Sequence, residues 1–186
     1  MIKRNLTRTS SAAGRETENE HSNMDNDLHQ LFLEELADVH NAEVQLTKAL
    51  PKMAKAAESD ELRQAIESHL QETEEHVSRL EEAASSVGGS IKRKTCAAMK
   101  GLVTEGEDIV KEQKGTAALD AGIIAAAQKV EHYEIASYGT LCAWAKQMGH
   151  NEALNLLQET LDEEKTANEK LTSIAESLAN LRAQSH

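Results

Sequence analysis

Two glutamates interrupt apolar stripes that have helical spacing. Along residues 32–53, the side chains spaced four and three apart are apolar except for Glu43, and residues 127–148 carry Glu134 at the equivalent place. Both carboxylates are therefore predicted to face a protein core. A buried carboxylate is costly to ionise, so it must be protonated, paired or bound to a cation.

Two further segments bring imidazole and carboxylate groups to the same kind of face. The sequence Leu-Gln-Glu-Thr occurs at 70–73 and again at 157–160. In the first copy, Glu72 shares a helix face with His69 and His76. The repeat places glutamates at the matching positions of the second copy, namely Glu159 and Glu163.

Together these residues predict a dinuclear metal centre. Carboxylate oxygen and imidazole nitrogen are donors that iron and manganese accept, and four helices can direct them to one point. The predicted ligands of two iron or manganese ions are Glu43, Glu72, His76, Glu134, Glu159 and Glu163. Glu131 competes with Glu134 as the ligand of its segment, and His69 competes with His76. A centre of this kind could act on oxygen or peroxide.

The composition favours an all-α protein and excludes several partners. The 186 residues include one proline and 2% aromatic residues, which is a helical mixture. A net charge of −12 argues against binding to nucleic acid or to an anionic membrane. No apolar run is long enough to span a bilayer and no secretory signal is evident, so a cytoplasmic location is expected. The two cysteines are 46 positions apart and predict no zinc or dithiol site.

Periodicity and glycines divide the chain into two antiparallel hairpins. The predicted helices are residues 27–55, 60–87, 116–148 and 151–181. Pro51 is expected to bend the first helix, and Asn151 to cap the last one. Residues 90–115 predict a long crossover that contains a short broken helix.

The N-terminal segment differs from the rest of the chain. Residues 1–24 lack helical or strand periodicity, which predicts a disordered tail. The remaining residues, 25–186, are then one four-helix bundle domain. At this size a chain buries enough surface for an ordinary core.

The chain resembles the ferritin-like bundle, and within it the YciE/YciF family of bacterial stress-associated proteins. The resemblance covers residues 27–180 and is carried by Ala-Glu-Val-Gln-Leu at 42–46, His-Leu-Gln-Glu-Thr at 69–73, and the stretches 125–134 and 159–165. It implies a ferritin-like fold, a homodimer and a role in stress response. The wider di-iron pattern asks for Glu-x-x-His on the second and fourth helices, and this chain has no histidine on the fourth.

Metal-free interpretations remain open for the same residues. Glu43 and Glu134 could be hydrogen-bonded to Tyr133, Tyr138 or His132, and Glu164 is most simply solvated. The chain would then be a helical scaffold that self-associates. A manganese catalase-like peroxide dismutase is another alternative, although more histidine would be expected at its centre.

Overall fold

The computed structural model describes residues 13–185, with side chains from residue 27 onward. These residues form helices and loops, with no strand among them. The elements are α1 (Ala13–Ala56), α2 (Asp60–Ser86), α3 (Ala97–Glu112), α4 (Leu119–Met148), α5 (Asn151–Ile174), the π-helical turn η1 (Ala175–Ala179) and α6 (Asn180–Gln184). The predicted all-α class is confirmed.

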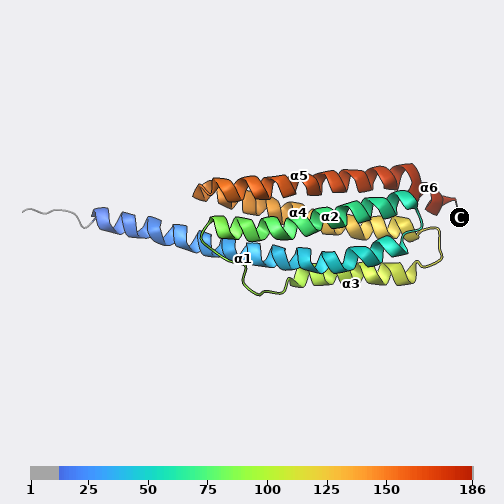
Figure 1. Cartoon of the computed structure of the whole chain (residues 1–186), viewed down its shortest axis with the longest axis horizontal. Helices are drawn as coiled ribbons and strands as arrows, with labels where there is room; N and C mark the ends of the chain where they lie inside the picture. Colours follow the sequence, from blue (N-terminus) through green and yellow to red (C-terminus); the bar gives the residue numbers. More distant parts are fainter. Residues whose placement is uncertain (1–12, 186) are drawn as a thin grey trace, which may run out of the picture.

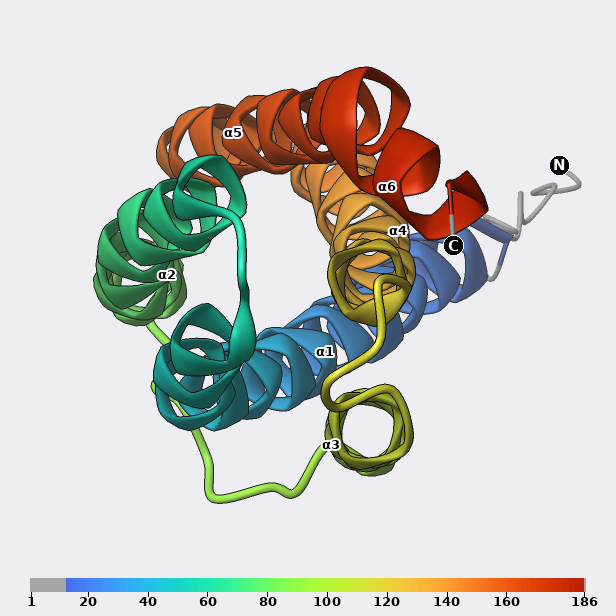
Figure 2. The same ribbon diagram turned by 90° about the vertical axis from the view of Figure 1, so that its right-hand side faces the viewer.

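Four helices surround a common axis. The hairpin of α1 and α2 packs against the hairpin of α4 and α5, and α3 lies outside the four, against α1 and α4 (Figures 1 and 2). This arrangement confirms the two predicted hairpins joined by a long crossover.

Several predicted boundaries differ from the structure. Helix α1 begins at Ala13 rather than near Asp27, and it continues through Pro51 to Ala56. Of the predicted tail, residues 13–24 belong to α1. For residues 1–12 the tail stays a prediction, since they lie outside the described residues. Helix α3 runs without a break through both of its glycines.

The last predicted helix is divided near its end. Regular α5 ends at Ile174, and a π-helical turn follows before α6. Ile174 and Ala179 are five residues apart and both are buried, a spacing that matches the i to i+5 pattern of a π-turn rather than an α-helix. Asn151 is the first residue of α5 rather than its cap, which is His150.

The turn between α1 and α2 is fixed by groups from two parts of the chain. The Ser59 hydroxyl caps α2 by accepting from the Leu62 backbone N–H. The buried Asp120 carboxylate of α4 accepts from the backbone N–H groups of Glu58 and Ser59, both at 2.9 Å. The start of α2 is therefore attached to α4 across the bundle.

The core consists of two hydrophobic clusters along the bundle axis. One contains Phe32, Leu36 and Leu80, and the other contains Leu46, Leu62 and Ile123. On α1, Glu43 lies between Leu36 of one cluster and Leu46 of the other, and on α2, residues 69–76 lie between Leu62 and Leu80. A layer of polar side chains thus lies between two apolar regions.

None of the helices in residues 13–185 combines the length and the apolar character that crossing a membrane requires.

Candidate metal centre

Six titratable side chains form the centre of the polar layer. They come from four helices and all are buried: Glu43 from α1, His69 and His76 from α2, Glu131 and Glu134 from α4, and Glu164 from α5. Each of these side chains lies on the face of its helix that points to the core. Residues about one turn apart share a face of a helix, so the acids and histidines follow the apolar residues of that face. The predicted burial of Glu43 and Glu134 is confirmed.

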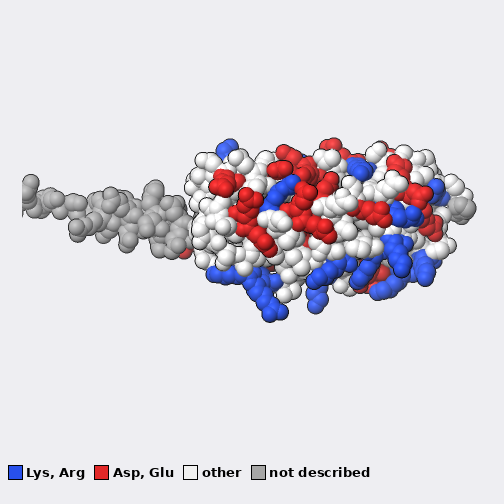
Figure 3. All heavy atoms as spheres, in the orientation of Figure 1, with Lys and Arg blue, Asp and Glu red and all other residues white. Residues whose placement is uncertain are grey.

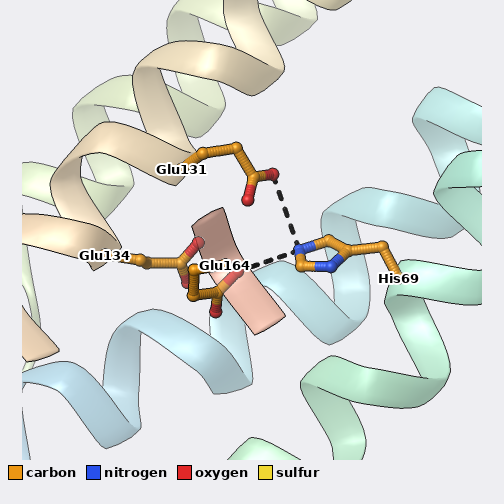
Figure 4. A group of neighbouring side chains, drawn as sticks. All are labelled: His69, Glu131, Glu134 and Glu164. Atoms are coloured by element: carbon orange, nitrogen blue, oxygen red, sulfur yellow. Dashed lines mark ion pairs between the residues drawn. The ribbon is translucent and has the colours of Figure 1, made fainter. Parts of the chain in front are cut away.

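One group of donors surrounds His69. Ligand atoms of His69, Glu131, Glu134 and Glu164 all lie within 4.8 Å of one another, and Figure 4 shows the four side chains converging. The Nε2 atom of His69 is 3.6 Å from Glu131 Oε1 and 3.7 Å from Glu164 Oε2. These separations exceed hydrogen-bond length and leave space between the donors for an ion.

A second group surrounds His76. Ligand atoms of Glu43, His76 and Glu164 also lie within 4.8 Å of one another. The Nδ1 atom of His76 is 3.6 Å from Glu43 Oε1 and 3.1 Å from Glu164 Oε1. The Tyr138 hydroxyl donates to Glu43 Oε1 at 2.6 Å, so one of the predicted hydrogen bonds to a buried acid is present.

Seven buried polar atoms of this centre lack a hydrogen-bond partner among the described residues. They are Glu43 Oε2, His76 Nδ1, Glu131 Oε2 and both carboxylate oxygens of Glu134 and Glu164. A buried acceptor without a partner costs about 1–3 kcal/mol, and more when it is charged. Their concentration at one place indicates that something absent from the chain itself satisfies them.

Each histidine is held from behind by a carboxylate outside the centre. Glu72 Oε2 lies 3.2 Å from His69 Nδ1, and Glu163 Oε2 lies 2.9 Å from His76 Nε2. When each ring carries a single proton on the nitrogen that faces the outer carboxylate, the opposite nitrogen, His69 Nε2 or His76 Nδ1, is presented to the centre, as in a metal-binding histidine.

The remaining predicted ligand lies outside the centre. The side chain of Glu159 is 60% exposed and pairs with Arg79 Nη2 at 3.2 Å. Arg79 also bonds both carboxylate oxygens of Glu163, one of them at 3.1 Å, and pairs with Glu75. This arginine neutralises the outer acids and holds Glu163 against His76.

Burial and mutual repulsion set the charge states of the acids. Burial raises the pKa of Glu134 well above its ordinary value, and the carboxylates of Glu164, Glu43 and Glu131 raise it further. Burial also raises the pKa of Glu43, and it raises that of Glu131 to about 8 although His69 opposes the shift. Without a cation the centre retains protons that its carboxyls would lose in water.

The pKa values of the two histidines are raised, although burial alone would lower them. Burial lowers the pKa of His69, but the charge of Glu131 and the hydrogen bond with Glu72 outweigh it and raise the pKa to about 9. For His76, close contacts with Glu164 and Glu43 outweigh burial and raise the pKa to about 11. Both rings lie in a strongly negative environment, which favours a cation.

The structure brings together only part of the predicted set. Among the predicted ligands, Glu43, His76 and Glu134 point into the centre, Glu72 and Glu163 stand behind the histidines, and Glu159 is at the surface. The sequence left two choices of ligand open, Glu131 or Glu134 and His69 or His76. All four of these side chains lie inside the centre.

The prediction that Glu164 is solvated is wrong, because its side chain is completely buried. The internal repeat aligns His76 with Glu163, but the residue of α5 that enters the centre is the next one, Glu164. Counting sevens along the helix gives Leu157, Glu164 and Leu171, all three of which are buried. That signal could have identified Glu164.

Comparison with known proteins places the chain in a family. A family model described as "Domain of unknown function (DUF892)" matches residues 27–184. The chain belongs to this DUF892 family. Protein YciF of Escherichia coli (strain K12) is 44% identical over 155 residues, 83% of this chain and 93% of YciF. The predicted resemblance to YciE/YciF proteins is therefore confirmed.

Solved structures show the same helical bundle. The crystal structure of the E. coli stress protein YciF is 42% identical and has a TM-score of 0.79, covering 86% of this chain and 98% of YciF. YcfI from Rhodopseudomonas palustris is 43% identical with a TM-score of 0.77, over 80% of this chain and 94% of its own. A protein from Xanthomonas campestris, at 22% identity and a TM-score of 0.66, shares the fold.

Proposed function

We propose that this chain binds two iron or manganese ions within the polar layer. One ion is held by His69, Glu131 and Glu134, the other by Glu43 and His76, and Glu164 is shared between them. The donors are carboxylate oxygen and imidazole nitrogen with no thiolate, a set suited to these metals. The proposal keeps the predicted cofactor but replaces the outer three predicted ligands by His69, Glu131 and Glu164.

The shared position of Glu164 is the observation that carries this proposal. Its Oε1 faces His76 and its Oε2 faces His69, and neither oxygen has a hydrogen-bond partner among the described residues. A carboxylate whose two oxygens face two separate donor groups is suited to bridging two cations. Bound cations would also relieve the repulsion among the buried carboxylates.

Iron or manganese would supply reversible electron transfer toward oxygen or peroxide. The chain's own residues would orient both histidines through Glu72 and Glu163 and keep bulk water from the centre by burial. Such chemistry suits a stress-response protein, and the similarity to the E. coli stress protein YciF supports that role. Homodimer formation and a cytoplasmic location are retained as part of this proposal.

Counting metal ions in substituted proteins tests the shared ligand. After loading of the chelated protein with Mn²⁺ or Fe²⁺ and desalting, elemental analysis should give about two ions per chain. Glu43→Gln and Glu131→Gln should each lose about one ion, because each removes a donor from one group. Glu164→Gln should lose most of both, because it removes the donor that the two groups share.

The matched control is Glu169→Gln, an exposed glutamate on the same helix. This variant should keep both ions. Tight binding in Glu164→Gln, or fewer than one ion in the unmodified protein, would overturn the proposal and leave the metal-free scaffold as the better interpretation. Thermal melting of each variant shows that it is folded before its metal content is interpreted.

A further inference from the structure

A cavity of about 440 Å³ lies beside the centre, between α2 and α5. The small side chains of Ala65, Ala127 and Ala167 line it and leave space that larger residues would fill. A water molecule occupies roughly 30 Å³, so the cavity is far larger than oxygen or peroxide requires. Its volume falls within the range of about 300–1,000 Å³ that is typical of sites for small organic ligands. The size therefore indicates an organic occupant.

The walls of the cavity are mainly apolar, and one wall reaches the centre. Leu50, Ile66 and Leu171 line it and are nearly completely buried. An apolar molecule that leaves water and packs against these side chains gains free energy in proportion to the area it buries. His69 and Glu131, two of the proposed metal-binding residues, line the cavity as well. A bound molecule would therefore have one end at the centre.

The charged side chains at the mouth of the cavity are already paired with one another. Each acid of the mouth forms an ion pair with a basic side chain: Glu72 with His69, Glu159 and Glu163 with Arg79, and Asp162 with Lys165. Figure 3 shows acidic side chains on this face with basic ones between them. Lys170 also lines the cavity, and it is exposed to water. A charged head group inside the cavity would lose its water and gain no unpaired opposite charge, so the lining favours an uncharged molecule.

One buried polar atom of the lining has no partner. The side chain of Glu131 is only 3% exposed, and its Oε2 lacks a hydrogen-bond partner among the described residues. A hydroxyl group can both donate and accept, so it can pair with this carboxyl in its ionised and in its protonated form. An ammonium group can only donate, and a carboxylate can only accept. The hydroxyl group is therefore the head group that suits Glu131.

We propose that this cavity binds an uncharged organic molecule that has an apolar body and one hydroxyl group, with the hydroxyl at Glu131. The body of the molecule packs against Leu50, Ile66 and Leu171. Its place beside a metal rests on the proposed function, whereas the binding itself depends on the cavity alone. Molecules of this class are the organic substrates that the centre would act on.

Three probes with one chain length test the binding in metal-free protein near neutral pH. Octanol, octylamine and octanoate share an apolar body and differ in the charge of the head group. Titration calorimetry should show octanol binding about tenfold tighter than either ion, because only octanol forms the hydrogen bond without burying a charge. Equal binding of the three would place every head group in water at the mouth and would overturn the proposal. Tighter binding of either ion would overturn it as well.

Substitution of Glu131 tests where the hydroxyl group lies. Glu131→Leu should weaken octanol binding about fivefold, the effect of one lost neutral hydrogen bond. Glu131→Gln is the matched control and should keep the affinity, because an amide both donates and accepts. Equal octanol binding by the two variants would show that the hydroxyl does not lie at Glu131.

Filling the cavity tests the position of the apolar body. Ala167→Leu adds bulk to the lining and should weaken octanol binding about tenfold, a loss equivalent to about two buried methylene groups. Ala143→Leu, at an exposed position on α4, is the control and should bind octanol as the unmodified protein does. Should Ala167→Leu fail to fold, the two Glu131 variants decide.

Unchanged octanol binding in folded Ala167→Leu would contradict the proposed site. If light scattering then shows that the same variant changes the oligomeric state, a second copy of the chain covers this face, and the proposal is overturned in favour of that interface.

Paramagnetic broadening distinguishes the cavity from the metal centre. Octanol proton signals should broaden on protein loaded with Mn²⁺, most strongly next to the hydroxyl group, and stay sharp on Glu164→Gln treated in the same way. Strongest broadening at the methyl end would overturn the proposed orientation. Octanol binding without retained Mn²⁺ would count against the metal centre and leave the cavity supported. Retained Mn²⁺ without octanol binding would overturn the cavity and leave the metal centre supported.

Discussion

At the scale of single residues, the histidines depend on carboxylates that do not enter the centre. Glu72 holds His69 Nδ1, and Glu163 holds His76 Nε2. Removing such an outer partner lowers metal affinity by about 10- to 100-fold in other proteins, because the ring loses its orientation and basicity. The two residues are therefore as informative to substitute as the donors themselves.

Glu72→Ala should weaken Mn²⁺ or Fe²⁺ binding at one of the two ions by about tenfold or more, since His69 then loses its hydrogen-bond partner. Competition with a chelator of known affinity measures this change. Glu74→Ala is the control, because its side chain is exposed on the same helix. Equal affinities in the two variants would show that Glu72 does not orient His69.

Residue patterns located the centre but did not define its donors. Glu43 and Glu134 could be predicted because each interrupts a run of apolar residues at constant spacing. The internal repeat does not predict Glu164, because it aligns Glu163 with His76, whereas the seven-residue period of α5 itself points to Glu164. Spacing predicts Glu72 and Glu163 as donors because it identifies a helix face, but it does not show how far a side chain reaches across that face.

At the scale of the helices, the position of α2 depends on a contact from α4. The Asp120 carboxylate accepts two backbone N–H groups at the start of α2. This contact could not be predicted, because the partners are about 60 residues apart in the chain and no local pattern links them. The helices themselves could be predicted, since their spacing, glycines and caps are local signals.

Asp120→Ala should lower the free energy of unfolding by about 2 kcal/mol, because two backbone donors lose their acceptor. Urea unfolding followed by circular dichroism measures the change. Asp108→Ala, whose carboxylate pairs with the exposed Lys111, should change it by less than about 0.5 kcal/mol. A similar small effect for Asp120→Ala would contradict the role assigned to this contact.

At the scale of the whole molecule, the polar layer makes stability depend on pH. The pKa of Glu131 is raised to about 8 and that of His69 to about 9. Both groups bind a proton more tightly in the folded chain than in the unfolded chain, so protonation stabilises the fold. This stabilisation is fully present below the pKa values of the unfolded chain, 4.5 for Glu131 and 6.5 for His69. It is lost as the pH rises through 8 and 9.

The melting temperature of the metal-free protein should therefore fall between pH 6 and pH 9, as calorimetry would show. Glu131→Gln should reduce this slope, and Glu74→Gln should leave it unchanged. With Mn²⁺ bound the trend should reverse, because metal binding releases these protons and strengthens as the pH rises. A melting temperature that increases with pH in the chelated protein would contradict this reasoning.

The layer also limits how the four helices can be aligned lengthwise. Sliding any one helix by a turn, about 5.4 Å, would move its acid or imidazole out of the layer and against hydrocarbon from a neighbouring cluster. Such a misplaced charge is far more costly than a shifted leucine, which finds another leucine beside it. The buried acids and histidines destabilise the middle of the metal-free bundle. They also favour one lengthwise alignment of the four helices during folding, because every other alignment would bury their charge against hydrocarbon.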